Sequence, residues 1–470
     1  MKNDPVRGLY INRTLNLRSI KAIGYDMDYT LIHYQTADLE RRAYELTRER
    51  LTNKGWPVAD LEFQPRSVIR GLAIDLDLGN LVKATRFGYV IKGAHGTRIL
   101  GYDELRDAYS GTLVDLAEDR FSFLNTLYSI SEANLFAQLV DQLDAGHIKG
   151  VMSYYDLAEA VGTALDATHM DGALKDEIHA DPDRYVAPDP EVVEALLDQR
   201  YAGKHLMLIS NSDWEFAAQM MSLAFDPYLP GSMTWRDLFD TIIVSAGKPL
   251  FFAHDHPFYR VVDEEQALMR PHFGKLEQGV VYVGGNATLL EESLDLSGDE
   301  ILYVGDHLFG DVHVSKSMFR WRTALIIREL ESETRDLVGF RDTQQVLEVL
   351  MDEKTQLERH RAQVRLALVR SEHGQGEATG SDQELTDQLA GLQELIAALD
   401  ERIAPLAQAS GELGNPLWGP IMRAGNDKSL FARQVERYAD IYTSRASNFL
   451  AETPFGFLRA PRGSLPHDPN

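Results

Sequence analysis

The chain has 470 residues, of which 44% are apolar, so two or three regions with cores of their own are expected. Its 72 acidic and 47 basic residues give a formal charge of −25, which disfavours binding to a nucleic-acid backbone or an anionic membrane. The absence of cysteine excludes disulfides, thiolate catalysis and cysteine-ligated metals, and fits a reducing compartment.

The N-terminal residues 1–18 are polar and predict an arm ahead of the first core strand. Residues 1–17 lack the apolar core of a signal peptide, and no apolar run of the sequence reaches membrane length. We therefore expect a cytoplasmic protein with a small-molecule substrate and with neither a nucleic-acid nor a membrane partner.

The stretch 21–31 is an apolar run that ends in Asp26 and Asp28 and continues to Thr30. If the run is a strand, both carboxylates follow its C-terminal end, the edge where open α/β sheets bind ligands. Alternation places the two side chains on one side, where a cation or a proton must separate their charges. Mg²⁺ suits this position because it prefers oxygen ligands. The alternative is an aspartate-rich turn that caps a helix.

A long region without further chemistry of this kind follows, and the next polar candidate is Ser210. The apolar positions Leu39, Ala43, Leu46 and Leu51 predict a helix over 37–53. Residues 66–100 predict short strands with turns at 79–80 and 93, and residues 121–175 predict helices, one of them over 123–142. Such a long region between two strand-end motifs suits an insertion that closes over the site as a lid and excludes water.

Two further strands end in polar candidates. The apolar run 205–209 precedes Ser210, which by its position alone is a candidate cap of the next helix. The run 241–245 leads to Lys248, which is either a fixed cation at the strand end or an ordinary surface lysine. Lys275 ranks lower because it follows no apolar strand. The glycines after the run 279–283 predict a structural turn.

A fourth strand, 301–305, leads to Asp306 and Asp311, and residues 322–327 supply a fifth. Two carboxylates at this strand end would complete a magnesium site together with Asp26. Four polar stretches that each follow an apolar strand are explained together by one fold and one chemistry.

These four stretches resemble motifs I to IV of the haloacid dehalogenase (HAD) superfamily, whose phosphatases read DxDx[TV] in motif I and GDx₄D in motif IV. The resemblance implies that Asp26 is the nucleophile and Asp28 the general acid and base. It also implies that Ser210 and Lys248 hold the phosphoryl group. The implied Mg²⁺ ligands are Asp26, the carbonyl oxygen of Asp28, Asp306 and Asp311.

The longer stretches 24–31, 210–213, 248–252 and 305–311 resemble the cytosolic purine 5'-nucleotidase family of the IMP/GMP type. The similarity runs from about residue 8 to 345 and returns at 430–440. It implies Mg²⁺-dependent hydrolysis of nucleoside 5'-monophosphates through an aspartyl-phosphate. Transfer of the phosphoryl group to a second nucleoside and a non-catalytic HAD-fold binding protein stay as alternatives.

The same resemblance implies six substrate contacts, with Asn211 at the phosphoryl group and a base-stacking role for Tyr128. The alternative for Tyr128 is a core aromatic residue, and the alternative for Asp166 and His169 is a solvated helix face. Gly162 stands where the family has an arginine, so a planar set of hydrogen-bond donors is missing. The implied substrate-binding residues are Asn125, Tyr128, Asp166, His169, Lys175 and Asn211.

The C-terminal part departs from the family. Leucines and isoleucines at spacings of three and four from 385 to 403 predict a helix with a heptad stripe, which Ser381 opens as a capping box. A second helix is predicted over 346–370, with a polar, mobile linker at 371–380 and a polar tail at 461–470. The hairpin 346–410 can pack on its own chain or on another subunit, and we expect a homo-oligomer.

The predicted fold is therefore of the α/β class. It has a HAD-like Rossmannoid core with a parallel sheet, formed by residues 1–35 and 186–345. An α+β cap, residues 36–185, is inserted into this core. The helical hairpin 346–410 follows, and residues 411–470 return to the core.

Overall fold

The structure is a computed structural model that describes residues 6–151, 153–170, 172–264, 266, 268–375 and 381–463. It divides into two compact units, one of Met1–Glu331 with Ile421–Asn470 and the other of Ser332–Pro420. The predicted linker from residue 376 to 380 and the tail from residue 464 lie outside the described residues. So do the first five residues of the predicted arm.

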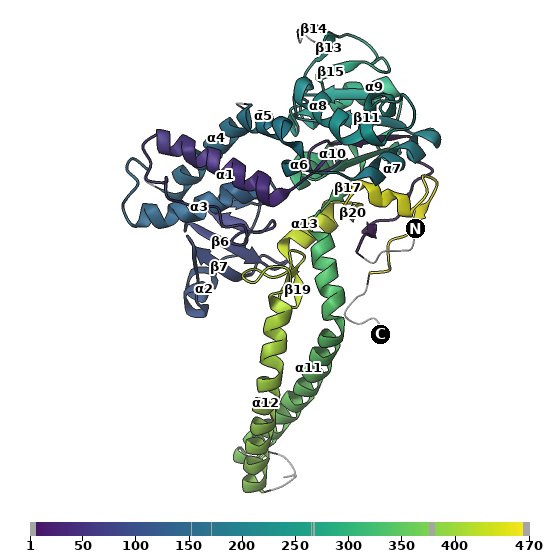
Figure 1. Ribbon diagram of the computed structural model, residues 1–470. Coiled ribbons are helices and arrows are strands. Elements are labelled where there is room, and N and C mark those ends of the chain that lie inside the picture. Colours follow the sequence, from purple (N-terminus) through teal and green to yellow (C-terminus); the bar gives the residue numbers. More distant parts are fainter. Residues whose placement is uncertain are drawn as a thin grey trace. The chain divides into compact units, whose positions relative to one another are not determined.

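The first unit is built on a ten-stranded sheet in the order β1-β20-β17-β16-β3-β11-β12-β15-β13-β14 (Figure 1). Its six central neighbours from β17 to β15 run parallel, and β20 continues them. The strands are β1 Tyr10–Ile11, β3 Ala22–Tyr25, β11 His205–Ile209, β12 Thr241–Val244, β13 Phe258–Asp263, β14 Leu268–Pro271, β15 Val281–Gly284, β16 Ile301–Gly305, β17 Arg322–Ile326 and β20 Ile441–Thr443.

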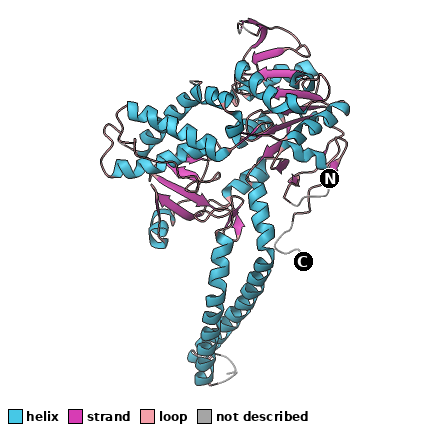
Figure 2. Cartoon of the chain, viewed as in Figure 1, coloured by secondary structure: helices cyan, strands magenta, loops and turns pink. Residues whose placement is uncertain are grey.

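The six central strands of this sheet, from β17 to β15, agree with the predicted apolar runs, whereas β1, β13, β14 and β20 were not predicted. Strand β3 is buried along its whole length between β16 and β11, with Ile23 opposite Leu302 and Leu206. Helices cover the sheet, so its inner strands have no polar face and form continuous apolar runs in the sequence (Figure 2). The predicted α/β class with a mostly parallel sheet is confirmed.

A second, antiparallel sheet lies in the inserted region, in the order β8-β7-β6-β5-β9. Its strands are β5 Ala73–Asp75, β6 Asn80–Ala84, β7 Val90–His95, β8 Arg98–Ile99 and β9 Phe121–Phe123. The predicted turn at Gly93 is wrong, because Gly93 lies inside β7 opposite Val82. A side chain at Gly93 would come within 2.9 Å of Leu105 and 3.1 Å of Leu100, so close packing explains this glycine.

The helices of the first unit agree with the predictions in part. The helix predicted over 37–53 is confirmed as α1. The helix predicted over 123–142 starts only at Ser129, because residues Phe121–Phe123 form a strand that pairs with β5. The helices of the first unit are α1 Thr36–Asn53, α2 Tyr102–Tyr109, α3 Ser129–Asp144, α4 Tyr154–Met170, α5 Ala173–Ala180, α6 Pro182–Tyr185, α7 Pro190–Tyr201, α8 Trp214–Phe225, α9 Ala287–Leu294, α10 Val314–Phe319 and α13 Leu430–Tyr438.

Three short ribbons complete the unit. Strand β4, His33–Tyr34, pairs with β10, Val186–Ala187, and so joins the points where the chain enters and leaves the inserted region. The other two ribbons pair β2, Leu15–Asn16, with β21, Phe457–Leu458, and β18, Arg423–Ala424, with β19, Asp427–Lys428. Gly284, Gly285 and Asn286 form the predicted structural turn, in which Asn286 caps α9.

The second unit is a pair of long helices, α11 Leu330–Glu372 and α12 Asp382–Gly411. The predicted start of the first helix at 346 is wrong, since α11 begins at Leu330 and one interior glycine, Gly339, does not break it. The predicted capping box at Ser381 is confirmed. Buried apolar residues join the helices in two clusters, one with Leu347, Leu350, Leu399 and Ile403 and one with Val364, Leu385 and Leu392. Within the described ranges, no helix has both the length and the apolar character of a membrane span.

Candidate active site

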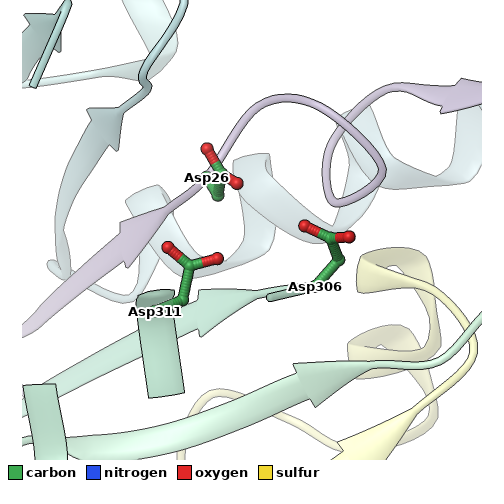
Figure 3. A group of neighbouring side chains, drawn as sticks. All are labelled: Asp26, Asp306 and Asp311. Atoms are coloured by element: carbon green, nitrogen blue, oxygen red, sulfur yellow. The ribbon is translucent and has the colours of Figure 1, made fainter. Parts of the chain in front are cut away.

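Three buried carboxylates meet at the C-terminal edge of the central sheet (Figure 3). Asp26 follows β3 and Asp306 follows β16, so the parallel pairing of these strands brings the two residues together. Asp311 lies one turn further on, in the helical turn Leu308–His313. One carboxylate oxygen from each residue lies within 4.8 Å of the others. This cluster is the predicted one.

Lys248 neutralises part of this charge. Its Nζ lies 2.8 Å from a carboxylate oxygen of Asp26 and 2.8 Å from one of Asp311, and it donates a hydrogen bond to the hydroxyl of Tyr303. The amide of Asn211 holds the backbone of Lys248, accepting from its N–H at 2.7 Å and donating to its carbonyl oxygen at 3.0 Å. Lys248 is therefore not an ordinary surface lysine but a fixed cation at the centre of the cluster.

Burial governs the protonation of the cluster. It raises the pKa of Asp26 to about 7, although Lys248 opposes the shift. Burial, together with the charges of Asp26 and Asp311, raises the pKa of Asp306 well above its usual range. Burial alone would lower the pKa of Lys248, but the carboxylates of Asp26 and Asp311 raise it well above the usual lysine value. The lysine therefore stays charged while the carboxylates compete for protons.

Asp28 stands apart from this cluster. Its Oδ1 accepts a hydrogen bond from the hydroxyl of Tyr34 at 2.5 Å, and its Oδ2 accepts one from the hydroxyl of Ser212 at 2.7 Å. Burial raises the pKa of Asp28, and these two hydrogen bonds oppose the shift. Both carboxylate oxygens are thus engaged, and the residue is suited to exchange a proton at a fixed place.

One cavity of about 440 Å³ brings these groups together. Its polar end is formed by the carboxylates and Lys248, and its other walls are aromatic and aliphatic. Tyr128 lies in the wall with its ring edge-on to Tyr29 and to His169, at centroid distances of 4.8 and 5.4 Å. Of the predicted site residues, those that line the cavity are Asp26, Asp28, Tyr128, His169, Lys175, Asn211, Lys248, Asp306 and Asp311.

Three predicted site residues are not brought to the cavity. Ser210 is buried, and its hydroxyl accepts from the N–H of Ser212, so it holds the loop instead of facing a ligand. The helix cap predicted as its alternative role belongs to Asp213, whose carboxylate accepts from the N–H of Phe216. Asp166 lies on the exposed face of α4, since the buried positions of that helix point elsewhere. Asn125 donates to the carbonyl of Phe123 two residues before it.

Lys175 lines the cavity but is already paired. Its Nζ lies 2.5 Å from the carboxylate of Asp213 and 5.2 Å from the ring centre of Phe216. Lys175 belongs to α5 of the inserted region, whereas Asp213 caps α8 of the core. The ion pair therefore ties the two parts together beside the cavity.

Four residues with polar side chains line the cavity and were not predicted as site residues. Tyr34 and Ser212 hold Asp28, the hydroxyl of Thr126 donates to Asp306 at 3.2 Å, and His307 accepts from the N–H of Gly310 through Nδ1. Ser212 lies two residues after Ser210 in the same loop, so its position was a usable signal. Tyr34 and Thr126 follow no polar motif, and only the fold shows that they reach the site.

The donor set fits a divalent cation that prefers oxygen. Three carboxylates from two neighbouring strand ends offer hard ligands within a few ångströms, and nitrogen or sulfur donors are missing from the cluster found among the described residues. Asp26, Asp306 and Asp311 would hold Mg²⁺ there, and Lys248 would remain beside it as a second positive charge.

The parallel sheet, the carboxylate cluster and the fixed lysine define a class of protein, an α/β enzyme that hydrolyses phosphate esters. The model of the 5' nucleotidase family matches residues 9–470, and the chain belongs to this family. The predicted membership is thereby confirmed.

Relatives carry the same family name. A 5'-nucleotidase domain-containing protein of Dictyostelium discoideum is 28% identical, over 99% of this chain and 75% of that one. Human 5'-nucleotidase domain-containing protein 2 is 27% identical, over 94% of this chain and 81% of its own. Among solved structures, CbbY from Rhodobacter sphaeroides in complex with phosphate aligns with 65% of this chain and 86% of that one, at 15% identity and a TM-score of 0.26.

Proposed function

We propose that this protein is a Mg²⁺-dependent 5'-nucleotidase that hydrolyses nucleoside 5'-monophosphates, purine nucleotides of the IMP/GMP kind above all, through an aspartyl-phosphate. The observation that carries the proposal is one cavity in which a carboxylate cluster with a fixed lysine faces an aromatic and aliphatic wall. A phosphate suits the first end and a flat base suits the second.

Hydrolysis would proceed in two steps. A carboxylate oxygen of Asp26 attacks phosphorus, the bond from phosphorus to O5' breaks, and Asp28 gives its proton to O5' so that the nucleoside leaves as an alcohol. Water then attacks the phosphorus of the aspartyl-phosphate, the bond between phosphorus and the Asp26 oxygen breaks, and the carboxylate of Asp28 takes a proton from the attacking water. Inorganic phosphate leaves, and Asp26 and Asp28 return to their starting states.

The other polar groups would hold the phosphoryl group in place and neutralise its charge. Lys248, 2.8 Å from Asp26, stabilises the negative charge of the transferring group, and phosphoryl transfer depends on such stabilisation more than on covalent chemistry. Bound at the carboxylate cluster, Mg²⁺ would supply further charge neutralisation at the phosphoryl oxygens. Asn211 fixes Lys248 through its backbone, and Ser210 supports the same loop.

The inserted region would choose the base. The wall around Tyr128 and His169 offers ring edges and apolar surface from α4, α5 and α8 of suitable size for a purine. We therefore extend the proposal to residues 36–185 as a cap that selects the substrate, in a cytoplasmic homo-oligomer that needs neither nucleic acid nor membrane. The absence of cysteine suits such a compartment.

The decisive experiment measures phosphate release from GMP, IMP, AMP and CMP with Mg²⁺ and with EDTA. We expect release that needs Mg²⁺ and favours the purines. The Asp26→Asn variant should lose activity by about four orders of magnitude or more while its circular dichroism stays unchanged, because a covalent nucleophile is removed. Near-wild-type release by Asp26→Asn would refute the covalent route, and release of phosphate from no nucleotide would refute the assigned substrate class.

A further inference from the structure

The carboxylate of Asp28 accepts hydrogen bonds from two hydroxyl groups, one at the entry to the inserted region and one in the loop after β11 of the core. Tyr34 donates to Oδ1 at 2.5 Å and Ser212 donates to Oδ2 at 2.7 Å. Two donors on opposite oxygens fix both the position and the plane of a carboxylate. We propose that Tyr34 and Ser212 are positioning residues that aim Asp28 at the leaving oxygen of the substrate, an inference that rests on the proposed hydrolysis.

The Tyr34 hydroxyl is itself held in place. Tyr34 is only 5% exposed and lies in β4, which pairs with β10 at the entry and exit of the inserted region. Its ring packs edge-on against Tyr29 at 5.2 Å. Tyr29 in turn donates from its own hydroxyl to Glu40 of α1. The ring therefore has little freedom to leave Asp28.

Glu40 continues this chain of contacts into the inserted region. Its second oxygen accepts from the backbone N–H of Ser131 at the start of α3, and the residue is 1% exposed. The path from Asp28 through Tyr34, Tyr29 and Glu40 thus ends in two helices of the region that carries the aromatic wall. A shift of those helices would reach Asp28 through packed side chains.

Ser212 supplies the second hydroxyl from the core. It follows β11 in the loop that also holds Asn211, and its backbone N–H donates to the hydroxyl of Ser210 at 3.0 Å. Its carbonyl oxygen accepts from the N–H of Ser245. The buried Ser210 does not reach the cavity, but it fixes Ser212, which in turn fixes Asp28.

A positioning role has a kinetic consequence that a purely structural role lacks. The 5'-alkoxide of a nucleoside is a poor leaving group and needs the proton of Asp28, whereas p-nitrophenolate leaves without one. Misplacing Asp28 should thus lower kcat/KM for nucleotides far more than for p-nitrophenyl phosphate. The ratio kcat/KM reports the steps up to phosphoryl transfer to Asp26, so slower hydrolysis of the aspartyl-phosphate does not disturb the comparison.

The test compares Tyr34→Phe and Ser212→Ala with wild type on IMP and on p-nitrophenyl phosphate. General acid catalysis contributes about 10²–10⁴-fold, so we expect each variant to lose about tenfold or more on IMP and less than about threefold on p-nitrophenyl phosphate. The double variant should lose less than the product of the two single losses, because both act through one carboxylate.

Tyr44→Phe is the matched control. It also removes a buried tyrosine hydroxyl from the inserted region, but that hydroxyl bonds Gln138 and is not part of the contacts that lead to Asp28. We expect it to change kcat/KM for the two substrates by the same factor. If Tyr34→Phe does not fold, as judged by circular dichroism, Ser212→Ala alone decides the question, since it removes a single oxygen atom.

The outcomes separate the inference from the proposed function. Equal losses on both substrates in both variants, or no loss on either, would overturn the positioning role, provided that Asp28→Asn itself shows the substrate-selective loss. Were Asp28→Asn as active on IMP as wild type, the proposed proton donor would be wrong, and the positioning role would fall with it.

Discussion

Asp26 and its neighbours concentrate negative charge in the interior of the protein. Three carboxylates face one lysine, and burial makes the remaining negative charge unfavourable in free energy. Protons can neutralise this charge when no metal is bound, and a divalent cation can neutralise it when one is. The two therefore compete for the same oxygens.

This competition predicts the pH dependence of metal binding. The pKa of Asp26 is about 7, so its carboxyl holds a proton at pH 6, and burial raises the pKa of Asp306 well above its usual range as well. The proton on Asp26 must leave before the oxygen can bind a cation, so the affinity for Mg²⁺ should rise by at least about fivefold from pH 6 to pH 7. Titration calorimetry in buffers of different ionisation enthalpy should show about one proton or more released per Mg²⁺ at pH 6.

The Asp26→Asn variant is the control for this prediction. It removes one titrating group and keeps the shape of the side chain, so the number of protons released at pH 6 should fall by about one. An affinity that is the same at pH 6 and pH 8 in the wild-type protein would show that the carboxylates are already ionised without metal.

The residues of the site also mark the limit of prediction from sequence. Asp26, Asp306, Asp311 and Lys248 could be predicted because each follows a buried strand whose apolar run is visible. The neighbours that hold them could not, because a hydrogen bond such as the one from Thr126 to Asp306 joins positions 180 residues apart. The loop of Ser210 could be predicted from the sequence, but the contact of its hydroxyl with the N–H of Ser212 could not, because it depends on how that loop folds.

At the scale of elements, the strands of the parallel sheet were predictable because both of their faces are buried and nearly every residue is apolar. The second sheet was harder. Gly93 looked like a turn, yet it lies in β7 opposite Val82, where a side chain would come within 2.9 Å of Leu105 and 3.1 Å of Leu100. The start of α11 at Leu330 was missed because no apolar period marks its first turns.

The two long helices permit a direct comparison of buried and exposed positions. Ile396 of α12 is 5% exposed, whereas its neighbour Leu395 is 55% exposed. Ile396→Ala should destabilise the hairpin by about 2–5 kcal/mol, because it leaves a cavity between the helices, while Leu395→Ala should change it by about 0.5 kcal/mol or less. Amide hydrogen exchange of α11 and α12 measures both effects in the intact chain.

Phosphate release should be the same in both variants, since the proposed catalytic carboxylates, Lys248 and the cavity all belong to the other unit. Faster exchange in Leu395→Ala that equals the change in Ile396→Ala would contradict the assigned inner face of α12. It would point instead to a further surface that covers Leu395.

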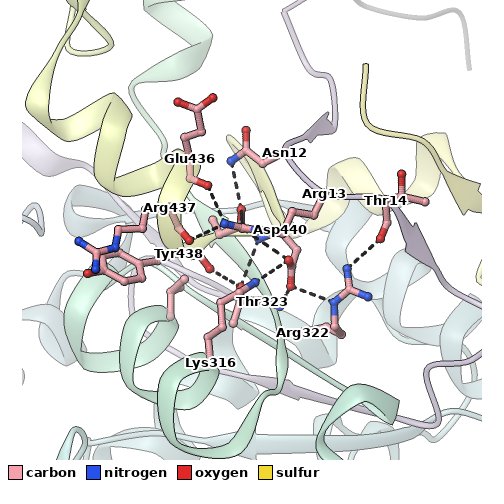
Figure 4. Close-up of polar contacts among 12 residues, drawn as sticks. Asn12, Arg13, Thr14, Lys316, Arg322, Thr323, Glu436, Arg437, Tyr438 and Asp440 are labelled. Atoms are coloured by element: carbon pink, nitrogen blue, oxygen red, sulfur yellow. Dashed lines mark hydrogen bonds and ion pairs between the residues drawn. The ribbon is translucent and has the colours of Figure 1, made fainter. Parts of the chain in front are cut away.

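At the scale of the whole molecule, the C-terminal part of the chain completes the central sheet. Strand β20 lies between β17 and β1 in the central sheet, so residues from both ends of the sequence share one edge of the core. Asp440, directly before β20, accepts from Lys316 at 2.5 Å, from Arg322 at 3.0 Å and from the N–H of Thr323 at 3.1 Å (Figure 4). Arg13 contacts the same carboxylate at 3.6 Å.

This arrangement predicts that the chain survives a cut between its two long helices. With a specific protease site placed at residues 376–380, the N-terminal fragment keeps every proposed catalytic residue. The C-terminal fragment stays bound through β20, Asp440 and the apolar contacts between α11 and α12. We expect the cleaved protein to elute as one species and to release phosphate at the rate of the uncut protein.

Asp440→Ala should weaken this association. The substitution leaves Lys316 and Arg322 without their shared carboxylate, which is 1% exposed, and loss of one partner of a buried ion pair costs about 3–5 kcal/mol. Asp427→Ala in the same fragment is the matched control, because its partner Arg86 is 43% exposed and such surface pairs contribute about 1 kcal/mol or less.

In a urea titration, the cleaved Asp440→Ala protein should release its C-terminal fragment at a clearly lower concentration than the cleaved Asp427→Ala protein does. Equal midpoints would show that Asp440 does not hold the C-terminal part, and fragments that separate without urea in the wild type would show that β20 and the paired helices do not hold it either.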